Sequence, residues 1–180
     1  MSDANLISMI GNLSQSLRPV ESLIAGLGYL IGIVFIISGL TKLKKIGDAK
    51  ANSSSQEHPH VPILLFIIGA VLLFLPSTLS VISNSAFGAG NILQYIQYKP
   101  FDVYSSMTIV IQTAGLVWFV RGCVLLVHGG EPGAKEGPKG LTFILAGVFA
   151  MNFEATYGIL NYFMNHLLNL KSAGQPGSGS

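Results

Sequence analysis

Charged side chains are scarce in this 180-residue chain, at 10% of the residues against about 25% in ordinary soluble domains. The net charge of +2 is too small and too scattered for a nucleic-acid-binding surface, so no sequence-specific nucleic acid binding is expected. Cys123 is the only cysteine, which excludes an intramolecular disulfide and a thiolate metal site. The N-terminus lacks the basic region and cleavage site of a secretory signal, so we expect the first apolar segment to remain as an anchor.

Sequence motifs for catalysis are also missing. The chain has no Walker A stretch, no haem-attachment CxxCH and no zinc-binding HExxH. Glu57, His58 and His60 in "EHPHVP" could hold a metal ion loosely, but a solvated loop is the preferred interpretation. The chain is therefore expected not to be an enzyme, and to need no metal and no cofactor other than lipid.

Apolar residues and glycine are abundant instead. Half of the residues are hydrophobic, 21 are glycine, and the mean hydropathy is +0.58. Four segments, at about 21–41, 61–83, 106–128 and 140–160 or as far as 168, approach the roughly 20 residues that a membrane-spanning helix needs. The second must continue past Pro76 with a kink, because residues 61–75 would rise only about 22 Å. The sequence predicts an all-α integral membrane protein with four transmembrane helices in two tandem hairpins.

Lysines determine the predicted orientation. Six of them fall in two loops that the four spans place on one side, namely Lys42, Lys44, Lys45 and Lys50 in loop 42–60, and Lys135 and Lys139 in loop 129–139. The other side has only three basic residues, so the positive-inside rule makes both loops cytoplasmic and the 84–105 loop and both termini periplasmic. The chain is therefore expected to be a multi-pass membrane protein.

The chain divides into successive segments by this pattern. Residues 1–20 are expected to form an amphipathic helix on the outer face of the membrane, with a disordered polar lead as the alternative. The first hairpin spans 21–83 and the second 106–168, and residues 169–180 form a flexible tail.

The two hairpins share a weak sequence repeat. "GIVFIISGLTKL" resembles "GLVWFVRGCVLL" with Gly32 opposite Gly115, an offset of 83 positions. "GAVLLFLPSTLSVI" resembles "GVFAMNFEATYGIL" with Gly69 opposite Gly147, an offset of 78. The matches indicate a tandem duplication in which both copies cross the membrane in the same sense. Chance similarity between apolar helices is the alternative.

A few residues stand out within the spans. Arg121 is expected about 9 Å inside the cytoplasmic end of the third span, where it either reaches the headgroups or faces a lumen or an acidic partner. Glu154 and Asn152 are polar residues within the fourth span, and Glu154 is expected too far along the normal to pair with Arg121 in one subunit. Small residues that permit close helix packing, within one bundle or between subunits, are Gly28, Gly32, Gly115, Gly122, Ala146 and Ala150.

Three stretches carry a resemblance to a known family. "LPSTLSVISNSAFG", "IQTAGLVWFVRG" and "GPKGLTFILAGVFAMN" resemble the IcmC (DotE) family of the Dot/Icm type IVB secretion apparatus, over about residues 6–165. The resemblance implies a small inner-membrane component of protein or DNA export, with relatives in conjugation systems linked to pilus or channel subunits. It brings no catalytic residues.

The expected function is therefore structural. The chain is predicted to be a pilin-like pair of fused hairpins that assembles with itself or a paralogue, in a membrane-bound or pilus-like form. Its expected partners are membrane lipid and other type IVB secretion subunits, and its basic residues, including Arg121, would line a lumen or touch lipid headgroups. A scaffold for other secretion subunits and a holin-like or small-solute pore are the alternatives, and a coupled transporter fits least.

Overall fold

The computed structural model describes residues 3–51, 60–88, 103–131 and 133–173, and every regular element in these ranges is a helix. The elements are α1 (Asp3–Ala51), α2 (His60–Leu73), α3 (Leu75–Phe87), α4 (Val103–Gly129), α5 (Gly137–Met151) and α6 (Phe153–Ala173). For these residues the prediction of an all-helical chain is confirmed. By length and composition α1 and α4 could each cross a membrane, and up to four spans result if each bent pair, α2 with α3 and α5 with α6, counts as one.

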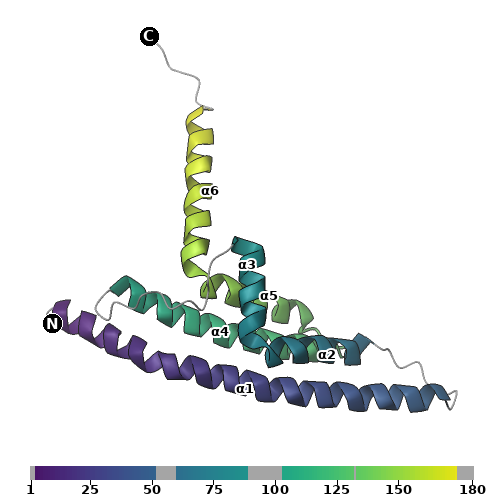
Figure 1. Ribbon diagram of the computed structural model, residues 1–180. Helices are drawn as coiled ribbons and strands as arrows, with labels where there is room; N and C mark the ends of the chain where they lie inside the picture. The colour runs from purple at the N-terminus through teal and green to yellow at the C-terminus, as the bar shows by residue number, and fades with distance from the viewer. Residues whose placement is uncertain (1–2, 52–59, 89–102, 132, 174–180) are drawn as a thin grey trace, which may run out of the picture.

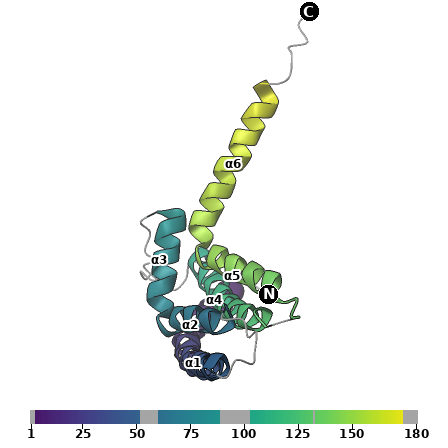
Figure 2. The same ribbon diagram turned by 90° about the vertical axis from the view of Figure 1, so that its right-hand side faces the viewer.

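Four helices form an elongated bundle and two project from it. α1, α2, α4 and α5 lie side by side along one direction, whereas α3 and α6 leave the bundle on the same side (Figures 1 and 2). α2 runs antiparallel to α1 and α5 antiparallel to α4, while α1 and α4 run in the same sense. The core between them is filled by large apolar side chains, of which Leu72, Leu75, Phe119 and Cys123 are almost fully buried.

α1 is longer than the predicted first span. Its 49 residues correspond to about 73 Å, so residues 3–20 continue into the apolar stretch without a break, with Pro19 inside the helix. The division expected at residue 20 is not visible in the backbone. At the other end, residues 42–51 were expected in a loop and are helical instead, because Lys and Ala favour helix and Gly47 is the only strong helix breaker in this stretch.

The predicted second span bends close to Pro76, as expected, but the bend is sharp enough to divide it into two helices. α2 and α3 meet at 94°, and the break falls at Phe74, two residues before Pro76. Pro76 has no N–H to donate to the carbonyl of Leu72, so the helix cannot continue straight through this point. α3 then begins with Pro76 in its first turn, where proline is tolerated.

The predicted fourth span is also bent, which the sequence analysis did not anticipate. α5 and α6 meet at 93°, with Asn152 at the break. The side-chain amide of Asn152 donates to the carbonyl of Val148 at 2.8 Å, and the Thr156 hydroxyl donates to the carbonyl of Phe149 at 3.0 Å. Such local side-chain bonds compete with the helical ladder and explain why the helix ends here. α6 then continues to Ala173, so residues 169–173 of the expected flexible tail are helical.

Candidate functional site: glycine crossings, corners and a basic end

Each antiparallel helix pair contains a close crossing of two glycines at an equivalent place. In the first pair, a Cβ atom added to Gly32 would lie 2.8 Å from the carbonyl oxygen of Gly69, and one added to Gly69 would lie 3.1 Å from that of Gly32. In the second pair the corresponding distances between Gly115 and Gly147 are 2.9 and 2.7 Å. Only glycine allows two backbones to approach this closely. The two crossings have nearly the same geometry.

The remaining small residues selected from the sequence lie at or beside these crossings. Gly122 lies against the backbone of Gly140 and Ile144, and the Cβ of Ala150 lies 2.9 Å from where a Cβ on Gly115 would be. Gly28 is in ordinary contact distance of Leu75, and Ala146 is half-buried on α5. Gly69, Gly140 and Gly147 are close-contact glycines that the sequence analysis did not select as packing residues, although Gly69 and Gly147 were visible in the repeat.

The two sharp bends, at Phe74 between α2 and α3 and at Asn152 between α5 and α6, also share one backbone geometry. We call these two bends the corners. Phe74 has φ −105° and ψ 36°, and Asn152, 78 positions later, has φ −103° and ψ 42°. At both corners the backbone N–H donates to the carbonyl four residues earlier in the chain, and the backbone carbonyl accepts from the N–H four residues later, at 2.8 to 3.1 Å. The offset of 78 is the one that aligns Gly69 with Gly147 in the sequence. The same backbone geometry therefore recurs in register with the sequence repeat.

α3 connects the two corners. The hydroxyl of Ser83, which is buried, donates to the side-chain oxygen of Asn152. Four residues further along α3, Phe87 packs edge-to-face on Phe149 of α5, with ring centroids 5.9 Å apart. Asn152, selected from the sequence as an intramembrane polar residue, thus bonds to the first half of the chain as well as to its own helix.

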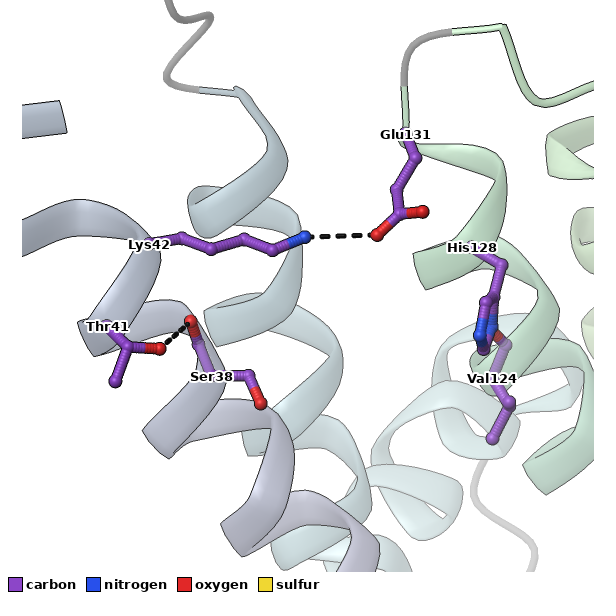
Figure 3. Close-up of polar contacts among 6 residues, drawn as sticks. All are labelled: Ser38, Thr41, Lys42, Val124, His128 and Glu131. Atoms are coloured by element: carbon purple, nitrogen blue, oxygen red, sulfur yellow. Dashed lines mark hydrogen bonds and ion pairs between the residues drawn. The ribbon is translucent and has the colours of Figure 1, made fainter. Parts of the chain in front are cut away.

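The two lysine-bearing segments lie at the same end of the bundle. The ammonium of Lys42 on α1 donates to the carboxylate of Glu131, just after α4, at 3.1 Å (Figure 3). At the opposite end of the shared length, the Thr113 hydroxyl of α4 donates to the Glu21 carboxylate of α1 at 2.9 Å. The other lysines of these segments, Lys44, Lys45, Lys50, Lys135 and Lys139, are exposed.

Arg121 and Glu154 are both exposed and lie on different helices. The Arg121 guanidinium carbon lies 5.6 Å from the centroid of the Phe143 ring, a cation–π contact, and Trp118 meets the same ring edge-on at 6.4 Å. No ion pair joins Arg121 to an acidic residue within the described ranges. In those same ranges no group of three or more metal-binding side chains occurs; Glu57 and His58 lie outside them.

Comparison of the chain with protein families, with characterised proteins and with solved structures found no match.

Proposed function

We propose that this chain is a non-catalytic structural subunit of a bacterial inner membrane, built from two tandem pilin-like hairpins that assemble with further copies. The observation that carries the proposal is the recurrence of one hairpin design, because the Gly32–Gly69 crossing matches Gly115–Gly147 and both hairpins end in a bend of nearly the same size. The resemblance of the sequence to the IcmC (DotE) family supports a place in a type IVB secretion or conjugation apparatus.

The proposed topology follows from helix lengths and charge. α1 and α4 cross the membrane completely, whereas α2 and α5, with 14 and 15 residues, rise only about 21 and 22 Å. They start from the lysine-bearing end, which the positive-inside rule assigns to the cytoplasm. The 94° and 93° bends then turn α3 and α6 towards the membrane plane near the periplasmic face.

α6 has the side-chain pattern that such a location needs. Asn161, Asn165 and Asn169 recur every four residues along one face of the helix, while Phe163 and Leu167 lie on the opposite face. All five side chains are exposed. A helix of this kind is stable with its apolar face in the acyl boundary and its polar face in water, so we assign α6 to the periplasmic interface.

A water-filled pore through a single copy is disfavoured by the packing. Both hairpins contribute to one described core, in which Leu72, Phe119 and Cys123 are at no more than 1% exposure. Conduction through one subunit would need a polar lumen there. Any channel would have to form between copies, which keeps self-assembly as the central property.

The test is the state of the full-length chain in bacterial membranes. Crosslinking with an amine-reactive reagent, followed by extraction in mild detergent and native electrophoresis, should give oligomers of the chain. Crosslinks exclusively to other proteins would support the scaffold alternative. Monomers alone, both in the membrane and after extraction, would contradict the proposed self-assembly.

A further inference from the structure

The two hairpins contact each other through different faces, and this leaves one copy of each face unused. On α1, Ile24, Ile31 and Phe35 share the helical face of Lys42, which contacts the second hairpin, and all three are half-buried against the core. We call these three the front face. On α4, Thr113 contacts Glu21 of α1. The residues of α4 that face α1 are therefore those that share the side of the helix on which Thr113 lies.

The facing residues on α4 form the back face. They are Thr113, Val120 and Cys123, and they are buried or half-buried within the chain. The front and back faces lie on opposite sides of corresponding helices, so the contact between the hairpins is head-to-tail rather than symmetric. A head-to-tail contact always leaves a free front and a free back at its two ends.

The sequence repeat identifies the free faces. With the offset of 83, the front face of the second hairpin corresponds to Met107, Ala114 and Trp118, all of them exposed on α4.

The free back face of the first hairpin follows from the same offset. It corresponds to Leu30, Ile37 and Leu40, which are exposed on α1 at 58%, 55% and 54%. The first hairpin thus presents to the outside the positions that the second hairpin buries within the chain.

We propose that a second copy of this chain covers these faces, with its back face (Leu30, Ile37, Leu40) against the free front face (Met107, Ala114, Trp118). The inference rests on the proposed self-assembly and specifies its contact. It continues the interface that already joins the two hairpins in one chain, so no new kind of packing is needed. Each added copy again presents one free front and one free back.

The contact also contains a shift along the bundle. Equivalent residues are 83 positions apart in α1 and α4, yet Glu21 lies beside Thr113, 92 positions later, and Lys42 beside Glu131, 89 positions later. The second hairpin is therefore displaced by six to nine residues, about 9 to 13 Å. The displacement is similar at both ends, so it is not produced by a crossing angle alone. Figure 1 shows it as the α5–α6 corner lying nearer the N-terminal end of α1 than the α2–α3 corner.

A repeated contact with a translation generates an open helical array instead of a closed ring. Within one chain the apolar stretches still overlap, because residues 21–42 of α1 lie beside residues 113–131. For the next whole copy the shift doubles to about 18 to 27 Å, most of the thickness of a bilayer core. Two copies joined by this contact cannot both span one bilayer at the same depth, so growth proceeds along the membrane normal and carries earlier copies out of the bilayer.

Cysteine crosslinking of the full-length chain in intact cells, which retain copies inside and outside the membrane, tests both the assigned faces and the displacement. Within one chain Glu21 lies beside Thr113. With the offset of 83, Glu21 corresponds to Tyr104 and Thr113 to Leu30, so Tyr104 of one copy should lie beside Leu30 of the next. A chain that carries both Leu30→Cys and Tyr104→Cys should therefore give a ladder of dimers, trimers and larger species. The two positions lie about 27 Å apart along the axis within one chain, so every link is between copies. Two further cysteine pairs are the controls. Ser22→Cys with Tyr104→Cys would be linked if the copies made the same contact without an axial displacement. Leu27→Cys with Tyr104→Cys places the cysteine on the side of α1 that belongs to neither the front nor the back face.

Each result has a defined meaning. A ladder that is several-fold stronger for the Leu30 pair than for the Leu27 pair is the expected outcome. A ladder from the Ser22 pair instead would overturn the displacement. No preference among the pairs, while amine-reactive crosslinking still gives oligomers, would overturn the proposed contact and leave self-assembly intact. Monomers with every reagent would overturn both proposals. Glu21→Cys with Thr113→Cys, which should link within one chain, verifies the reaction.

A bulky substitution provides the second measurement. In the Leu30 and Tyr104 cysteine pair, Ile37→Trp should reduce the ladder at least several-fold because it enlarges a side chain inside the contact. Val34→Trp, which is on the unused side of the same helix and is also exposed, should leave the ladder unchanged. Equal effects of the two tryptophans would contradict the assigned back face.

Discussion

Replacing Gly115 by alanine should destabilise the second hairpin. The added Cβ would lie 2.9 Å from the carbonyl oxygen of Gly147, from the amide nitrogen of Met151 and from the Cβ of Ala150. Two of these atoms belong to the backbone, so α5 must move away. Overpacking of this kind costs about 1 to 3 kcal/mol, and the higher helix propensity of alanine recovers up to about 1 kcal/mol. We expect a net loss of about 1 to 2 kcal/mol.

Gly26→Ala is the matched control for this substitution. Gly26 also lies inside a helix, but a Cβ there meets no atom within 4 Å, so only the gain in helix propensity remains. Unfolding titrations in mixed detergent, followed by the fluorescence of Trp118, the single tryptophan, should separate the two variants by about 2 kcal/mol. Equal stability of Gly115→Ala and Gly26→Ala would refute the close crossing of α4 and α5.

Three further substitutions test the corner, the contact between hairpins and the basic end. Asn152→Leu removes the hydrogen bonds to Ser83 and Val148 and should cost about 1 to 3 kcal/mol, whereas Asn161→Leu on the exposed part of α6 should cost little; similar unfolding midpoints would contradict the role of the corner. Thr113→Val removes the bond to the Glu21 carboxylate and should cost about 1 to 2 kcal/mol. Thr142→Val, whose hydroxyl bonds only within its own helix, is the control, and an equal loss there would count against this contact. Lys42→Ala should cost at most about 1 kcal/mol, since its ion pair is exposed, and the cost should vanish in high salt; a larger or salt-independent loss would be unexpected.

The helical character and the glycine crossings were accessible from the sequence for a simple reason. Apolar segments of membrane length predict helices, and small residues spaced by four or seven mark places where helices approach closely. Gly115 and Gly122 satisfied this pattern and both lie in close contact with α5. The sequence repeat also aligned Gly69 with Gly147. In the structure Gly69 contacts Gly32 and Gly147 contacts Gly115, so the aligned glycines occupy equivalent places.

The size of the two bends and the axial displacement of the second hairpin could not be predicted from such sequence patterns. Pro76 predicts a kink, but the 94° bend depends on where α3 packs after the break. At Asn152 the signal was weaker still, because a single amide in an apolar run bends a helix only when it finds a partner such as Ser83. The helical continuation through Lys42 and Lys50 follows from the helix propensity of lysine and alanine, because a cluster of charges does not by itself end a helix. The axial shift between hairpins depends on side-chain packing between helices and leaves no periodic pattern in either one.

The proposed topology requires both lysine-bearing segments to lie on the cytoplasmic side of one membrane. Lys44→Cys and Lys135→Cys, introduced one at a time, can be labelled with a membrane-impermeant maleimide in intact cells and in inverted membrane vesicles. Both positions should react in the inverted vesicles and stay unlabelled in intact cells. Labelling of the two positions from opposite faces of the membrane would contradict the paired-hairpin topology, and with it the proposed assembly.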